Sequence, residues 1–134
     1  YQIVNLNVKG VATNGDYLTN TRNMFNGNNS LYLELDYLNT SNVTETNDMF
    51  RDTQATTLDL SSFDTSNVTS MGSMFRNDQA TTLDLSSFDT SNVTNMTFMF
   101  ANSQATIGYA RTQTDADNFN NSSGKPSTLT FVVK

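Results

Sequence analysis

The chain has 134 residues, a net charge of −6 and a hydrophobic fraction of only 36%. This length suits one domain with a buried core, and the acidic charge argues against nucleic acids and anionic membranes as partners. Cysteine and histidine are absent, which excludes a disulfide framework, a thiolate metal site and the commonest general base. No apolar run approaches the roughly 20 residues of a membrane span, and the start at Tyr1 without a signal peptide indicates a fragment of a longer protein.

A repeat dominates the sequence. The stretch QATTLDLSSFDTSNVT at 54–69 recurs unchanged at 79–94, 25 positions later. Apolar residues follow the same period in these columns: Leu33, Leu58 and Leu83; Leu35, Leu60 and Leu85; Met24, Met49, Met74 and Met99; Phe25, Phe50, Phe75 and Phe100. A fixed period of this length is typical of stacked repeats, in which each unit packs on the next.

The period predicts one domain over 1–134. We expect an N-terminal capping repeat at 8–32, core repeats at 33–57, 58–82 and 83–107, and a C-terminal cap at 108–134. The cap ends in the alternating run 127–134, which suits a strand that closes the open end of the stack.

Each repeat has its own order of elements. Thr57–Ser61 alternates polar and apolar side chains and predicts a short strand with one buried face, and Asp64–Asn67 has turn chemistry. Val68–Phe75 has apolar residues at helical spacing and predicts a short helix. The expected fold is therefore an α/β repeat solenoid of the leucine-rich-repeat type, with a short parallel sheet on one face, short helices on the other and capped ends.

The segments LDLSSFDTSNVTSMGSMF at 58–75 and LDLSSFDTSNVTNMTFMF at 83–100 resemble the repeat of BspA-like leucine-rich-repeat surface proteins of Gram-positive bacteria. The resemblance is clearest over 33–107, and GKPSTLTFVVK at 124–134 looks like the end of such an array. It implies a secreted, wall-anchored protein on the cell surface. It also implies adhesion to a host matrix or mucus glycoprotein, and it brings no catalytic motif.

If the strand leucines point inward, the residues between them form an outward face. One column of that face holds Glu34, Asp59 and Asp84, followed by Tyr109, and the second repeat adds Tyr32 and Asp36. We name these six residues as the candidate ligand-binding set, because exposed aromatic rings and carboxylates suit protein or sugar recognition. The alternatives are that the acids only keep the sheet soluble, and that Tyr32 and Tyr37 cover the junction with the first repeat.

Three further columns favour structural roles. Asn42, Asn67 and Asn92 are expected to form an amide ladder between repeats, although each begins a formal glycan acceptor triplet. Asp64 and Asp89 are expected to cap turns and not to bind calcium. Phe98 is expected to pack under the C-terminal cap, with Phe119 or Phe131 as partner.

The composition favours binding over catalysis. Carboxylates on an open face lack the apolar pocket that raises the pKa of a general acid, so we expect no enzyme, no catalytic residue, no metal site and no cofactor. The main prediction is an extracellular binding module that recognises a partner through the outward face. The alternative is a spacer or homophilic self-association module of a surface protein.

Overall fold

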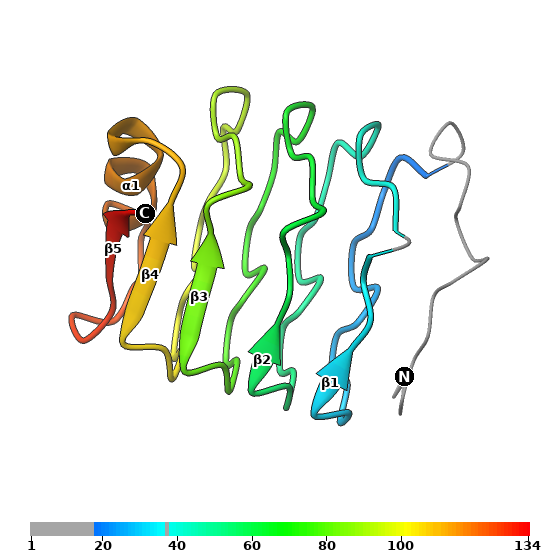
Figure 1. Cartoon of the computed structure of the whole chain (residues 1–134), viewed down its shortest axis with the longest axis horizontal. Helices are drawn as coiled ribbons and strands as arrows, with labels where there is room; N and C mark the ends of the chain where they lie inside the picture. Colours follow the sequence, from blue (N-terminus) through cyan, green and yellow to red (C-terminus); the bar gives the residue numbers. More distant parts are fainter. Residues whose placement is uncertain (1–17, 37) are drawn as a thin grey trace.

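The computed structural model describes residues 18–36 and 38–134. Its elements are β1 (Tyr32–Leu33), β2 (Thr57–Leu58), β3 (Thr82–Leu85), β4 (Ile107–Ala110), α1 (Gln113–Asn120) and β5 (Thr130–Val133). Figure 1 shows the repeats side by side along the long axis, with α1 and β5 at the C-terminal end. Tyr37 and most of the repeat expected at 8–32 lie outside the described residues.

Neighbouring strands pair in parallel at the spacing of the sequence repeat within two separate sheets, β1–β2 and β3–β4–β5, so β2 and β3 are not paired and the continuous sheet that the sequence predicts is divided. Leu33 lies opposite Leu58 in the β1–β2 pair, and Leu83 lies opposite Gly108 in the β3–β4 pair, while β5 pairs with the other edge of β4. The alternate leucines are buried and the residues between them are exposed or half-exposed, as the alternation predicts. The strands are shorter than expected in the second and third repeats.

The short helices expected opposite the strands are not found. Among the described residues the one helix is α1, which lies in the cap. Residues 72–77 form successive turns instead. The backbone N–H groups of Met71, Ser73 and Phe75 donate to carbonyl groups of the next repeat at 2.8–2.9 Å. Those of Met74 and Arg76 close turns with the residue three positions back. An α-helix would turn every N–H after its first four inward to its own carbonyl groups, and this alternation of bonds within and between repeats would be lost.

These turns require left-handed backbone at two positions in each repeat. The first column is Asn23, Asp48, Ser73 and Phe98, and the second is Gly27, Asp52, Asn77 and Asn102, all with φ between 55° and 72°. Glycine, asparagine and aspartate tolerate this region best, so the residue types of both columns fit the turns. Ser73 and Phe98 are the exceptions. The Phe98 ring lies beside Gly124 of the cap and the guanidinium group of Arg76, but it is 46% exposed, and the described ring contacts do not include the expected pairing with Phe119 or Phe131.

The core is a stack of phenyl rings. Phe25, Phe50, Phe75 and Phe100 lie with centroids 5.6–6.0 Å apart and nearly parallel planes. Phe119 of α1 meets the end of this stack edge-on at 85°. Offset ring pairs add about 0.5–1.5 kcal/mol each beyond the area that they bury. The ring stack therefore stabilises the same register as the strand pairing.

The C-terminal cap replaces one more repeat. Gly108 stands in the leucine column because Phe131 of β5 fills that space, and a Cβ at Gly108 would lie 2.3 Å from its ring. The amide of Asn120 closes the outer edge of β5: it donates to the carbonyl oxygen of Phe131 at 3.0 Å and accepts from its N–H at 2.8 Å.

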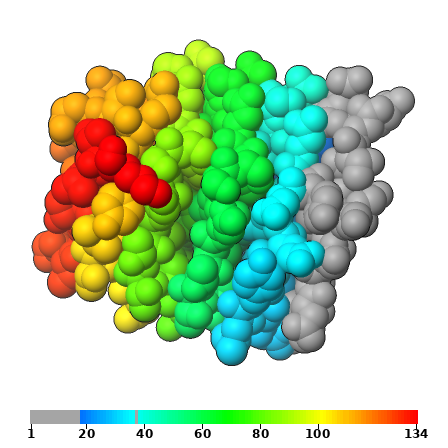
Figure 2. All heavy atoms as spheres, in the orientation of Figure 1, coloured from blue at the N-terminus to red at the C-terminus, as the bar shows by residue number. Residues whose placement is uncertain are grey.

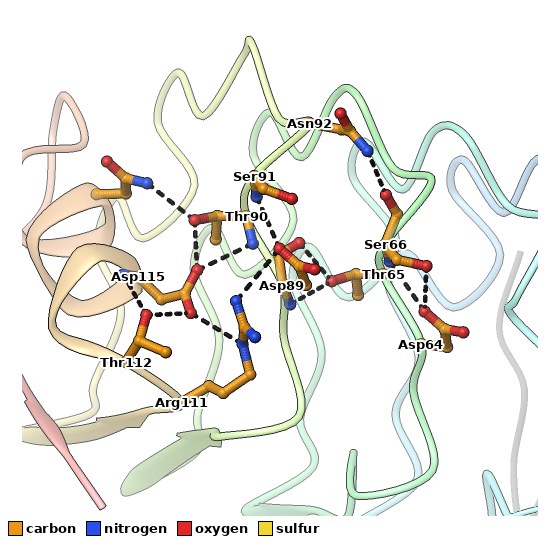
Figure 3. A network of polar contacts seen from close by, with 11 residues as sticks. Asp64, Thr65, Ser66, Asp89, Thr90, Ser91, Asn92, Arg111, Thr112 and Asp115 are labelled. Atoms are coloured by element: carbon orange, nitrogen blue, oxygen red, sulfur yellow. Dashed lines mark hydrogen bonds and ion pairs between the residues drawn. The ribbon is translucent and has the colours of Figure 1, made fainter.

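The polar ladder between repeats also ends on side chains of the cap (Figure 3). Within the stack, the Thr65 hydroxyl donates to the carbonyl oxygen of Asp89 at 2.9 Å and accepts from its N–H at 2.8 Å. One repeat later, the Thr90 hydroxyl donates to Asp115 Oδ1 at 2.6 Å and accepts from Asn118 Nδ2 at 2.8 Å. Asp115 and Asn118 of α1 thus make the two hydrogen bonds that the backbone of a further repeat would make.

The structure confirms two of the expected structural roles. Asn67 donates to the carbonyl oxygen of Ser41 in the preceding repeat at 2.7 Å, and Asn92 makes the equivalent bond at 2.6 Å. Asp64 and Asp89 each accept a backbone N–H from the serine two residues later, at 3.0 and 2.9 Å. Both columns therefore stabilise the loops that follow the strands.

One buried column contains a carboxyl group where its neighbours are neutral. Asn28, Thr53 and Ser103 each accept the backbone N–H two residues later through a side-chain oxygen. In the described structure, neither oxygen of the buried Asp78 has a well-formed hydrogen bond. Burial raises the pKa of Asp78 to about 6, although the nearby Ser103 hydroxyl and Ala80 N–H oppose the shift.

We expect Asp78→Asn to stabilise the protein at neutral pH, because it removes a buried charge and Asn28 shows that an amide oxygen in this column accepts the N–H two residues later, although Nδ2 of Asn28 has no hydrogen-bond partner. The pKa of Asp78 is higher in the folded than in the unfolded chain, so its contribution to stability is present below pH 4 and lost as pH rises through about 6. The variant should gain roughly 1–3 kcal/mol at pH 7. Urea unfolding of both proteins from pH 4 to 7 measures this difference, and a less stable variant at pH 7 would contradict it.

We expect Asp115→Ala to destabilise the fold by about 2–4 kcal/mol, because it leaves the buried hydroxyl and N–H of Thr90 without an acceptor. The matched control is Asp117→Ala, which removes an exposed acid from the same helix. Its free energy of unfolding should stay within about 0.5 kcal/mol of the parent value. Thermal unfolding measures both variants. Equal effects would show that the cap does not depend on this ladder.

Candidate functional site

The candidate site is the strand face, which we define as the outward side chains on and just after β1 to β4. It comprises Tyr32, Thr57, Thr82 and Ile107; Glu34, Asp59, Asp84 and Tyr109; and Asp36, Ser61, Ser86 and Arg111. All twelve are exposed or half-exposed, so all six residues of the predicted binding set lie on this face. The structure places them in adjacent rows because the strands pair at the repeat spacing.

Two of the predicted acids are held by serines. Asp59 Oδ1 accepts the N–H of Ser61 at 3.1 Å and its hydroxyl at 2.6 Å, and Asp84 makes the same pair of bonds with Ser86 at 3.0 and 2.6 Å. The hydroxyl and N–H of Ser61 lower the pKa of Asp59, so this carboxylate remains ionised at neutral pH. In the second repeat Asp36 replaces the serine, so a second acid stands where the other repeats carry a hydroxyl donor.

Sequence reasoning missed the cation that pairs with Asp84 on this face. Lys134, which follows β5, forms an ion pair with Asp84 Oδ2, and its ammonium group lies 5.9 Å from the centre of the Tyr109 ring. Burial favours the neutral form of Asp84, but hydrogen bonds from Lys134 and Ser86 outweigh it and lower its pKa. The three acids of the column are therefore not equivalent. Fifty residues separate Lys134 from Asp84, and only the pairing of β5 with β4 brings them together.

Charge is distributed unevenly along the strand face. At the C-terminal end Arg111 forms ion pairs with Asp89 at 3.3 Å and Asp115 at 3.0 Å, as Figure 3 shows. Within residues 18–36 and 38–134, no lysine or arginine lies within ion-pair distance of Glu34, Asp36 or Asp59. Among the described residues, the second and third repeats thus carry the acids of this face that have no ion-pair partner.

The N-terminal end of the strand face also exposes apolar surface. Leu31 and Tyr32 are 65% and 59% exposed, whereas the corresponding pairs in the next two repeats are Thr56–Thr57 and Thr81–Thr82. The packing of a repeat therefore does not require a large apolar side chain at either position. A hollow of about 560 Å³ borders Leu31 on the loops before the strands. It is lined mainly by side chains with amide and hydroxyl groups.

Residues 3–110 match the family described as "Mycoplasma protein of unknown function, DUF285". The chain belongs to the DUF285 family. This is a family of BspA-like surface repeats, so the resemblance of 58–75 and 83–100 holds at the level of the family. No curated protein and no solved structure matches the DUF285 chain.

The described part of this DUF285 chain has neither a cluster of metal-binding side chains nor a membrane-spanning helix. Residues 18–36 and 38–134 contain no group of three or more acidic, histidine or cysteine side chains arranged to hold a metal ion. In the same residues no helix has both the length and the apolar character needed to cross a membrane.

We expect Lys134→Met to raise the pKa of Asp84, because the substitution removes a hydrogen bond and a positive charge that lower it. Asp89 is the internal control: Ser91 and Arg111 lower its pKa, and neither contacts Lys134. Carbon NMR titration of the aspartate carboxyl groups measures both. An unchanged Asp84 titration would show that the ion pair does not persist in solution.

Proposed function

We propose that this chain is a non-catalytic binding module, built as a repeat solenoid, that recognises a partner through the N-terminal half of the strand face. The observation that carries the proposal is the exposed pair Leu31–Tyr32 beside Glu34, Asp36 and Asp59. Packing does not explain this apolar pair, because the next repeats manage with threonine. An apolar anchor within a ring of charge is the usual anatomy of a protein contact.

The rigidity of the strand face supports this proposal. Each repeat is tied to the next by several backbone hydrogen bonds, such as those from Thr69 to Thr44 and from Thr94 to Thr69 at 2.8 Å. Side chains on such a frame lose little conformational freedom on binding, so more of the contact energy appears as affinity.

The charge of the face defines the partner. Carboxylates without an ion-pair partner attract a basic protein surface. The BspA-like resemblance suggests adhesion to a host, so the proposed partner is a host matrix or mucus glycoprotein with a basic segment. The BspA-like resemblance supports an extracellular place on a Gram-positive cell wall. The lowered pKa values of Asp59 and Asp84 favour binding over acid catalysis, which needs a raised pKa.

We expect the double variant Leu31→Thr, Tyr32→Thr to lose affinity by at least about tenfold, because it removes the apolar anchor. The substitution copies the next two repeats, so the fold should tolerate it. Ile107→Thr makes the same kind of change at the far end of the face and is the matched control. Surface plasmon resonance against immobilised mucin, fibronectin, fibrinogen and collagen, at low and physiological salt, measures the affinities.

Binding should also weaken as salt increases, because exposed charges attract the partner. If none of these ligands binds the parent chain, the spacer role replaces the proposed one. Self-association in light scattering would instead favour the homophilic role. Equal affinities of the double variant and Ile107→Thr would move the contact away from the second repeat.

A further inference from the structure

A groove of about 360 Å³ lies on the strand face between the third and fourth repeats. One wall carries Thr57, Asp59 and Ser61, and the other carries Asp84, Ser86 and Lys134. In Figure 2 the last residues of the chain, in red, project across the neighbouring repeats on this face. The groove therefore combines side chains of two repeats with the end of the cap.

The two repeats offer the same carboxylate in the same setting. In each, one oxygen of the aspartate takes both hydrogen bonds from the serine two residues later. The other oxygen of Asp84 contacts the ammonium group of Lys134. Among the described lysines and arginines, none reaches the equivalent oxygen of Asp59 within ion-pair distance.

Lys134 shows which chemical group this groove accepts. Its ammonium meets a carboxylate whose orientation is fixed, and it lies 5.9 Å from the face of an aromatic ring, a favourable arrangement for a cation. The Lys134 side chain is 57% exposed, so it can leave the groove without opening the core. With two carboxylates and one ammonium, the groove retains one uncompensated negative charge.

We propose that this groove binds a lysine side chain of a partner protein at Asp59, and that Lys134 is its internal competitor at Asp84. The proposal rests on the proposed function, because it names the group by which a basic partner would contact the strand face. When Lys134 swings out, both carboxylates become available and two lysine side chains of the partner can bind, one at each repeat.

The test uses the whole chain and a synthetic hexalysine peptide, with the fully acetylated peptide as a probe that keeps the length and loses the charge. Isothermal titration calorimetry at low ionic strength measures the affinities. Asp59→Asn keeps an oxygen that can accept both bonds from Ser61 and removes the charge. Asp64→Asn is its matched control, because Asp64 accepts the same two bonds from Ser66 at 3.0 and 2.6 Å outside the groove.

We expect Asp59→Asn to weaken hexalysine binding by about fivefold and Asp64→Asn by less than about twofold. Lys134→Met should strengthen binding by about fivefold, because the competitor is gone. Arg22→Met removes a cation outside the groove and controls for net charge, so it should change the affinity much less. The acetylated peptide should bind none of the proteins.

Equal effects of Asp59→Asn and Asp64→Asn, or of Lys134→Met and Arg22→Met, would overturn the groove and leave only general charge attraction. This result is independent of the matrix-protein experiment. If the matrix ligands bind through Leu31 and Tyr32 while hexalysine ignores the groove, the proposed function stands and the inference fails. If hexalysine follows the expected pattern and no matrix ligand binds, the groove stands and the proposed partner is wrong.

Discussion

The structure depends on backbone hydrogen bonds that run from each repeat to the next at a fixed spacing of 25 residues. Alternate N–H groups of the turn segment, such as those of Met71, Ser73 and Phe75, donate hydrogen bonds to carbonyl groups of the following repeat and not of their own. A single inserted residue would break this alternation at one junction and put the phenyl rings on its two sides out of register with each other. This constraint fixes the period of 25 residues, and the side chains that recur at 54–69 and 79–94 fit one repeat to the next through the buried columns.

Much of the fold can be predicted from the sequence. The period places the leucines and phenylalanines in buried columns, and the alternation around Leu58 places the outward residues correctly. The helix expected over Val68–Phe75 is wrong, because apolar spacing alone cannot distinguish a helix from turns that also bury every third or fourth residue. The residues at the left-handed positions were the missed signal, since Asn77 and Asp52 recur where φ is positive. Gly108 is explained only by Phe131, which arrives from outside the repeat.

The candidate site was predictable where it follows the repeat and unpredictable where it does not. Glu34, Asp59 and Tyr32 lie on the face that the alternation assigns to them. Lys134 could not be placed, because its position depends on the pairing of β5 with β4 and no repeat partner exists for it. The cap therefore changes the electrostatics of the column that it closes, and the outermost acid differs from its copies although its local sequence is the same.

The cap also has a genetic consequence. It recognises the last repeat through features that all core repeats share, such as the Thr90 hydroxyl and the end of the phenyl stack. Identical neighbouring segments favour unequal recombination, which adds or removes one whole repeat and leaves both ends unchanged. Each such event would lengthen or shorten the strand face by about 4.8 Å and by one serine-held carboxylate. The number of charges on the surface can thus evolve in single steps without any redesign of the fold.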